Sequence, residues 1–202
     1  MYTNKYFEET DRSRVLSFMR KYPFAIIVNT DNGIPIATHL PFIIEEKNNK
    51  LLLLSHFATA NAQAKHLLNS TTLVIFSEPN AYISPGNYEQ EKNVPTWNYI
   101  AVHAYGKTRL IEDESGKFNL LNKTIQRFEA GYQQQWDGLT ENYKSNMLKG
   151  IVGFEVEIND IQATFKLSQN RTDRERDTII GELSKGPDPG SRAIANEMKG
   201  IR

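Results

Sequence analysis

Hydrophobic residues along the first 80 positions recur in short runs separated by polar turns, a pattern typical of an antiparallel sheet. Before these runs, apolar residues at helical spacing predict a helix over Arg12–Lys21, capped by Thr10 or Asp11. Four strands are then expected, over 24–28, 34–44, 51–55 and 72–76. The first two are joined by Asn32 and Gly33, a pair that tolerates the positive φ angles of a type I′ turn.

The middle of the chain alternates between helical and extended patterns. Helices are predicted over 58–68, over 143–148 and from a cap at Ser115, where Phe118, Leu121, Ile125 and Phe128 follow at helical spacing. A long loop is expected over 84–96 and the longest strand over 98–111. Residues 151–158 alternate as a half-buried strand, and 163–167 continue the sheet.

The sequence changes character after residue 170. Residues 171–185 form a charged helical pattern, Gly186-Pro187-Asp188-Pro189-Gly190 interrupts it, and 192–199 form a last short helix. We therefore expect a domain over 1–170 and a helical tail over 171–202. The fold class expected is mainly β with α. It is a small barrel of about six short, mostly antiparallel strands with helices around it, because strands and helices do not alternate as a parallel sheet requires.

Composition excludes several classes of protein. The 202 residues contain no Cys, so neither a disulfide framework nor a thiolate metal site is possible. The four His residues lie at 39, 56, 66 and 103 without an HExxH motif, and no metal site is expected. The N-terminus is polar and no run reaches about 18 apolar residues, which predicts a cytoplasmic protein with no membrane contact.

Charge and motifs narrow the function further. Lys plus Arg and Asp plus Glu number 24 each, a balance that argues against a bulk nucleic-acid binder but leaves room for a local basic patch. The tail has basic residues at 171, 174, 176, 185, 192, 199 and 202, but the acidic residues 173, 175, 177 and 182 largely cancel them. No GxSxG, P-loop or GxGxxG motif occurs, and the stiff Gly-Pro-Asp-Pro-Gly break does not suit a helix-turn-helix.

The stretch VPTWNYIAVHAYG at 94–106 has an unusual mixture of aromatic and polar residues for a strand. Strand alternation places Trp97, Tyr99, Ala101, His103 and Tyr105 on one face. Thr96, Asn98, Ile100, Val102 and Ala104 share the other, which is small and aliphatic enough for a barrel interior. The aromatic face either packs against another subunit or lines a flat ligand, and both interpretations remain open.

Three further segments combine polar groups with apolar scaffolding. Thr38 and His39 lie within a strand, where they can face a ligand or be satisfied by backbone at a barrel rim. In SHFATANAQAK at 55–65, small residues lead from a strand end into the predicted helix, whose N-terminus and Lys65 favour an anion. The alternative is a capped helix with a solvated lysine. The cluster KLSQNR at 166–171 can bind an anionic or carbonyl-rich ligand, or can serve only as a charged helix cap.

These motifs together resemble the PaiB family, bacterial FMN-binding proteins that act as negative transcriptional regulators of protease production and sporulation. The resemblance rests, in order along the chain, on ATHLP (37–41), SHFATANAQAK (55–65), AYISPGNY (81–88), VPTWNYIAVHAYG (94–106) and KLSQNR (166–171). It implies an FMN-binding split barrel like that of pyridoxamine-phosphate oxidase, forming a homodimer with two flavin sites at the subunit interface. Two tryptophans of the family motifs are missing, in SPGNY at 84–88 and in ANAQAK at 60–65, which would thin the walls of a pocket.

The resemblance also implies a set of cofactor-binding residues, with Lys65 and Asn61 at the FMN phosphate. The full set is Thr38, His39, Leu40, Ser55, His56, Asn61, Lys65, Trp97, Asn98, Tyr99, Lys166 and Gln169. Trp97, Asn98 and Tyr99 would close the pocket from the second subunit, although strict alternation places Asn98 opposite the two aromatic residues.

Three functions follow from this resemblance and stay open at this stage. The first is a dimeric FMN-binding repressor that acts on DNA directly or through another regulator. The second is a flavin-dependent oxidoreductase of the same barrel class, in which His39, His56 and His103 are the only side chains with an ordinary pKa near neutrality. The third keeps the barrel and the dimer without flavin.

Overall fold

The structure is a computed structural model that describes residues 1–201, and it divides the chain into two compact units. The first unit comprises Met1–Val15, Phe76–His103 and Gln162–Arg202, and the second comprises Leu16–Ile75 and Ala104–Ile161. These boundaries fall elsewhere than the expected division at residue 170, which stays a prediction. Arg202, one of the basic residues of the predicted tail, lies outside the described residues.

Five strands open the second unit: β1 (Phe24–Asp31), β2 (Ile34–Pro41), β3 (Ile43–Lys47), β4 (Lys50–Ala58) and β5 (Thr72–Phe76). The predicted turn at Asn32 and Gly33 is confirmed, because their φ values of 47° and 83° are those of a tight hairpin between β1 and β2. A second hairpin joins β3 to β4 through Asn48 and Asn49, at φ 52° and 61°. Asparagine tolerates this left-handed conformation better than other residues with a Cβ.

The continuous strand expected over 34–44 is wrong, because the chain breaks at Phe42. The Phe42 side chain is fully buried and meets Phe154 edge to face, with ring centroids 6.3 Å apart. Its backbone N–H donates to the Pro23 carbonyl at 2.9 Å instead of to a strand partner. The break allows β2 to pair with β1 while β3 pairs with β4.

The helix expected over 58–68 is also wrong. β4 continues through Ala58, which pairs with Ile151, and only a short 3-10 helix, η2 (Ala62–His66), follows. Gln63 is the reason that no longer helix forms, since its side chain is buried among β1 and β2 and holds the segment against them.

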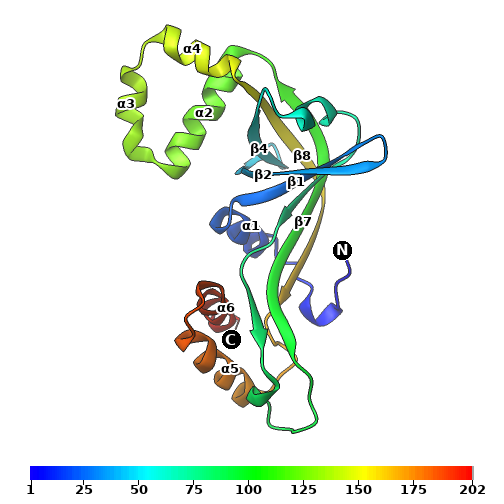
Figure 1. The fold of residues 1–202 in the computed structure, drawn as a ribbon. Coiled ribbons are helices and arrows are strands. Elements are labelled where there is room, and N and C mark those ends of the chain that lie inside the picture. Colours follow the sequence, from blue (N-terminus) through cyan, green and yellow to red (C-terminus); the bar gives the residue numbers. More distant parts are fainter. Residues whose placement is uncertain (202) are drawn as a thin grey trace. The chain divides into compact units, whose positions relative to one another are not determined.

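The remaining helices of this part of the chain follow the sequence pattern more closely. α1 (Arg12–Lys21) has the predicted bounds, and Asp11 caps it by accepting from the Ser13 N–H at 2.8 Å. α2 (Glu114–Phe128) is capped by Asp113 and not by Ser115, because the Asp113 carboxylate accepts from the Gly116 N–H at 2.7 Å. α4 (Glu141–Lys149) contains the short helix predicted over 143–148, whereas α3 (Gln133–Gly138) was not predicted. Figure 1 shows α2, α3 and α4 as successive helices between β7 and β8.

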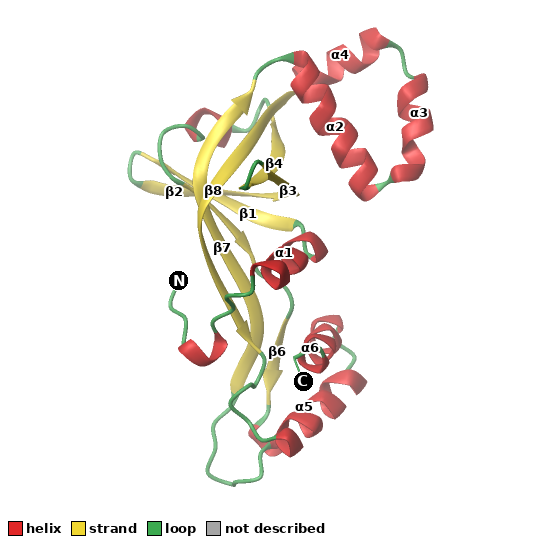
Figure 2. Cartoon of the chain, turned by 180° about the vertical axis from the view of Figure 1, so that it is seen from behind, coloured by secondary structure: helices red, strands yellow, loops and turns green. Residues whose placement is uncertain are grey.

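The two longest strands, β7 (Thr96–Ile111) and β8 (Ile151–Lys166), have residues in both units. β8 is one continuous strand where the sequence indicated two segments. The first unit adds β6 (Asn80–Ile83), which was not predicted, and the helices α5 (Asp173–Lys185) and α6 (Pro189–Lys199). α6 contacts both α5 and β6, as Figure 2 shows, and its residues Ile194, Ala195 and Met198 are fully buried.

The sheet has the strand order β2-β1-β5-β7-β8-β4-β3, with β6 paired to β7. The strand pairs whose register is determined are antiparallel, as the alternating sequence predicts. The expected fold class, an antiparallel barrel-type sheet with helices around it, is therefore confirmed, with eight strands in place of about six.

Candidate functional site

The two faces predicted for the strand at 96–105 are present in β7. Trp97 is 53% exposed, whereas Asn98, Ile100 and Val102 on the opposite face are fully buried. Tyr99, His103 and Tyr105 are half-buried on the Trp97 face. Ala101 on the same face is buried, so within the described chain this face is open at its Trp97 end and half-covered further along, while the two faces follow the predicted alternation.

β6 places a second exposed ring beside Trp97. Tyr82 lies directly opposite Trp97 in the β6–β7 register, and the two rings meet edge to face with centroids 5.9 Å apart. Tyr82 is 50% exposed, while its neighbours Ala81 and Ile83 are buried. The sequence pattern predicted no element over residues 77–83 and Tyr82 was therefore missed, although the alternation of Ala81, Tyr82 and Ile83 was a usable signal.

Asn98 lies in the interior and makes its hydrogen bonds within the chain. Its Nδ2 donates to Ser168 Oγ at 2.9 Å, and its Oδ1 accepts from the same hydroxyl at 3.2 Å. Asn98 therefore does not share the open face of Trp97 and Tyr99, and we leave it out of the site.

Lys166 is the last residue of β8, and its side chain reaches Thr96, the first residue of β7. Its ammonium donates to Thr96 Oγ1 and lies 5.7 Å from the centroid of the Phe7 ring. Burial lowers the pKa of Lys166 below its ordinary value, and the nearby charge of Arg171 lowers it further. Lys166 is half-buried, and its ammonium is held on the Thr96 side of β7, opposite the face that carries Trp97.

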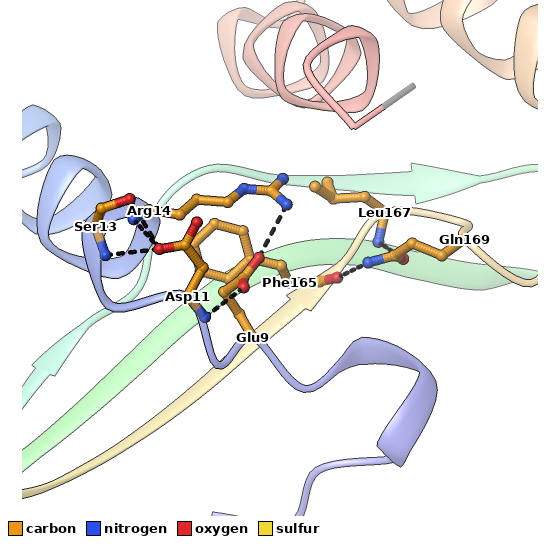
Figure 3. Close-up of polar contacts among 7 residues, drawn as sticks. All are labelled: Glu9, Asp11, Ser13, Arg14, Phe165, Leu167 and Gln169. Atoms are coloured by element: carbon orange, nitrogen blue, oxygen red, sulfur yellow. Dashed lines mark hydrogen bonds and ion pairs between the residues drawn. The ribbon is translucent and has the colours of Figure 1, made fainter.

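Both ends of the Gln169 amide are hydrogen-bonded within its own segment. Figure 3 shows its side chain folded back onto its own segment, where it accepts from the Leu167 N–H at 2.7 Å and donates to the Phe165 carbonyl. Arg14 lies over the Phe165 ring at 4.9 Å and pairs with Glu9 in the same view. Gln169 therefore terminates the strand, and its side chain is not part of the proposed site.

Arg171, at the end of KLSQNR, contacts the loop that precedes β7. The guanidinium lies 3.7 Å from the centroid of the Tyr88 ring and donates to Asn93 Oδ1 at 3.1 Å. Thr172, not Arg171, caps α5 in a capping box with Glu175. At this end of KLSQNR, the contacts agree with the alternative that the segment has a structural role next to a helix cap.

In the second unit, Thr38 and His39 point to opposite faces of β2. Thr38 Oγ1 donates to Gln63 Oε1 at 2.7 Å and accepts from Asn61 Nδ2 at 3.1 Å. His39 is exposed and stacks on Phe24, with ring centroids 6.2 Å apart. Leu40, the next residue along the strand, is half-buried. The structure thus brings together Thr38 and Asn61, while His39 faces the other way.

Gln63 is the centre of a buried polar network that sequence reasoning did not assign. Its Nε2 donates to the Ile27 carbonyl at 3.1 Å and to Asn29 Oδ1 at 3.0 Å. Asn29 in turn donates to Thr72 Oγ1 at 2.9 Å, which lies 2.7 Å from Thr108 Oγ1. The network fixes η2 on the sheet and so determines where Lys65 lies.

Ser55 and His56 also alternate across their strand. Ser55 is buried and donates to the Pro41 carbonyl at 2.7 Å, so its hydroxyl is occupied. His56 is half-buried opposite Gly153 of β8. Burial lowers the pKa of His56 below 6.5, because the apolar surroundings favour the neutral imidazole.

Lys65 is exposed at the end of η2 and, within residues 1–201, no side chain or carbonyl holds its ammonium. The helix whose N-terminus was expected to favour an anion does not form, because η2 has only five residues. A phosphate at this segment would rely on the ammonium of Lys65.

The arrangement of strands and helices resembles that of solved flavin-binding proteins. The flavocytochrome Anf3 from Azotobacter vinelandii superposes with a TM-score of 0.65 at 17% identity, covering 81% of this chain and 72% of that chain. The FAD and heme binding protein from Mycobacterium smegmatis superposes with a TM-score of 0.60 at 16% identity, covering 79% and 73%. These similarities define the class of fold, the split barrel, and not the ligand.

Sequence comparison then defines the family. Residues 1–160 match the family described as "Putative FMN-binding domain". The chain is 38% identical to "Protease synthase and sporulation protein PAI 2" of Bacillus subtilis, over 98% of this chain and 97% of that protein. An uncharacterized protein of Emericella nidulans is 29% identical over 98% and 96% of the two chains. The chain therefore belongs to this FMN-binding family, and the family predicted from its motifs is confirmed.

FMN is the cofactor that this membership assigns, and the residues of each unit fit parts of it. Trp97 and Tyr82 offer exposed aromatic faces of the kind that a planar isoalloxazine can contact. Lys65 offers a phosphate an exposed ammonium that no group of residues 1–201 holds. Among residues 1–201, no group of three or more His, Asp or Glu side chains is placed to hold a metal ion. Within the same residues, no helix has the length and apolar character needed to cross a membrane.

The lowered pKa of His56 predicts a specific pH dependence of stability. Because the folded-state pKa of His56 lies below the ordinary 6.5, the unfolded chain binds a proton at a higher pH than the folded chain does. The neutral, half-buried His56 therefore contributes its full stability above about pH 6.5. This contribution is lost as the pH falls from there through the folded-state pKa. We expect His56→Gln to flatten the fall in the free energy of unfolding between pH 7 and 5, measured by urea unfolding. His39→Gln, which changes an exposed imidazole, is the control, and an unaltered slope in His56→Gln would contradict the assignment.

Proposed function

We propose that this protein is a homodimeric flavoprotein that binds FMN and acts as a negative regulator of transcription, as the PaiB-type resemblance implies. The observation that carries the proposal is the exposed Trp97–Tyr82 pair on β6 and β7. Two large aromatic residues that are each about half exposed and in mutual contact are unusual on a free surface, and they favour a partner or a planar ligand. The 38% identical Bacillus subtilis relative, named for protease synthesis and sporulation, supports the regulatory part.

The proposed site uses the side chains whose hydrogen-bonding or stacking groups are open. Lys65 binds the phosphate, and Thr38 and Asn61 hold the segment that carries it. The isoalloxazine lies against the aromatic face contributed by the partner subunit's Trp97, with Tyr99 of that face beside it. Lys166, whose ammonium is held at Thr96, lies near the rim. His39, Leu40 and His56 stay in the proposal as strand positions whose backbone or ring can border the flavin, whereas the side chains of Ser55, Asn98 and Gln169 are occupied elsewhere.

Lys65 provides the direct test of the phosphate position. Because its ammonium is exposed and has no described partner, Lys65→Ala should leave the free energy of unfolding unchanged. It should weaken FMN binding about tenfold or more, the effect of losing a contact to a charged group. Fluorescence titration with FMN measures this, with Lys107→Ala, another exposed lysine, as the control. Equal FMN affinity in the wild-type and Lys65→Ala proteins would remove Lys65 from the site.

Two basic residues of the tail over 171–202 are already engaged within the chain and are poorly placed to bind DNA phosphates. Arg171 lies over Tyr88, and Arg176 is 9% exposed and donates to the Met198 carbonyl. Three residues join α5 to α6, a connection as short as that of a helix-turn-helix, although the sequence argued against such a turn. α6 packs on β6, and its exposed face carries only two basic residues, Arg192 and Lys199, of which Arg192 already donates to the Gly186 and Pro187 carbonyls. The proposal therefore favours regulation through another protein over direct binding to DNA.

The experiment that tests the function begins with the visible absorption spectrum of freshly purified protein and a titration with FMN. Flavin absorbance and saturable binding support the proposal, and their absence with an intact dimer would favour the flavin-free alternative. Sedimentation must show a dimer at micromolar concentration. Gel shifts at increasing salt then detect direct DNA binding, which must weaken steeply with salt. Rapid NAD(P)H oxidation by the FMN-loaded protein would instead favour the flavin-dependent oxidoreductase.

A further inference from the structure

The helices α2 and α4 line a surface cavity of about 250 Å³ that contains none of the residues assigned to FMN. Phe118 and Leu148 form its apolar wall, and Ser115 and Ser145 contribute hydroxyls. Its volume is smaller than the roughly 300–1,000 Å³ of pockets that hold drug-sized ligands. A molecule bound here must therefore be a small metabolite.

A buried ammonium lines this cavity. Lys144 is 5% exposed, which is rare for lysine without a firmly held partner. Its Nζ donates to Glu141 Oε1 at 2.9 Å and to the Asp137 carbonyl at 3.4 Å. The Glu141 side chain is 88% exposed, so this ion pair is weak and its carboxylate can be exchanged for another.

An aromatic stack continues behind the cavity wall. The Lys144 ammonium lies 5.6 Å from the centroid of the Phe118 ring, and Phe118 stacks on Trp136 with centroids 5.8 Å apart. Trp136 is 5% exposed, and its indole N–H has no hydrogen-bond partner within the described chain. A change at Phe118 or Lys144 is thus transmitted directly to a buried indole.

The charges around the cavity have both signs. Lys144 is positive and buried, whereas Glu114 and Glu141 are negative and exposed at the rim. A purely anionic ligand would meet two carboxylates, and a purely cationic one would meet the ammonium. The complement is a small molecule with a carboxylate, an ammonium and an apolar part.

We propose that the α2–α4 cavity binds an α-amino acid. The ligand's carboxylate takes the place of Glu141 at the Lys144 ammonium, and its ammonium binds Glu141 and Glu114 at the rim. Its side chain lies against Phe118 and Leu148. This effector site goes beyond the proposed function and does not depend on FMN, so either can fail without the other.

The two tryptophans of the chain make the test specific, since Trp97 is exposed and Trp136 lies behind the cavity wall. In ¹⁵N-labelled protein they give two indole N–H signals, which Trp97→Phe assigns. Titration with each of the common L-amino acids up to millimolar concentration should shift the Trp136 signal and leave that of Trp97 in place. The N-acetyl and amide derivatives of the amino acid that binds should bind at least about tenfold more weakly, because each lacks one charge.

Two variants and a control decide the assignment. Lys144→Met keeps the buried stem and removes its charge, and Glu141→Gln removes the charge of an exposed side chain while keeping its size. Each should weaken binding about tenfold or more, whereas Lys47→Met, an exposed lysine on β3, should not. If no amino acid shifts the Trp136 signal, or if the shift survives both variants, the proposal is overturned and Lys144 serves only to join α3 to α4.

Discussion

Trp97→Ala is expected to release FMN and dissociate the dimer together. The exposed indole contacts Tyr82 on one side and is open on the other, so it offers more area to a partner or a flavin than any other side chain of this strand. Truncating a central tryptophan of an interface costs about 2 kcal/mol or more, which is roughly a 30-fold loss of affinity. FMN titration and sedimentation on the same samples measure the two losses.

The exposure of Trp97 also makes this experiment easy to interpret. Because the side chain is not part of the buried core, the far-ultraviolet circular dichroism spectrum should be unchanged. Phe128→Ala, which removes another aromatic side chain that is 45% exposed, is the matched control and should alter neither flavin nor dimer. If Trp97→Ala retains both, then the aromatic face of β7 serves another purpose and the proposed flavin position is wrong.

Among the single substitutions considered, Gln63→Ala is expected to cause the largest loss in the free energy of unfolding. Its amide donates to the Ile27 carbonyl and to Asn29, both shielded from solvent, and it accepts from the half-buried Thr38. Removing it leaves buried polar groups without partners at about 1–3 kcal/mol each, so we expect a loss of about 3 kcal/mol in the free energy of unfolding. For a chain of this length that corresponds to roughly 6–12 °C in Tm.

Urea unfolding measures the Gln63 effect, and Gln134→Ala provides the comparison. Gln134 lies exposed on α3, so its replacement should change stability by less than about 0.5 kcal/mol. Thr38→Val combined with Gln63→Ala should lose less than the sum of the two single changes, because the residues share a hydrogen bond. Additive losses, or a Gln63→Ala variant as stable as wild type, would show that the network does not hold η2.

Local patterns in the sequence were sufficient wherever one residue or one period decides the structure. Asn32 and Gly33 gave the β1–β2 hairpin, Asp11 gave the start of α1, and the alternation along β7 separated Trp97 from Asn98. Each depends on φ preference, a capping side chain or strand geometry, which act within a few residues. The motifs likewise identified the family before the fold was known.

Contacts between distant segments decided the rest. The helix expected over 58–68 does not form, because the Gln63 amide finds its partners 27 to 36 residues away in β1 and β2 and holds the chain in a short 3-10 turn. Phe42 ends β2 because its ring is buried against Phe154, more than 100 positions further on. Tyr82 becomes a candidate site residue only through its register with Trp97. The sequence alone determined the family, the class of sheet and the two faces of its longest strand, since these follow from local periodicity and motif. Only the tertiary structure decided which polar side chains are already occupied and which remain open, because a hydrogen-bond partner is specified by distance in space and not by distance along the chain.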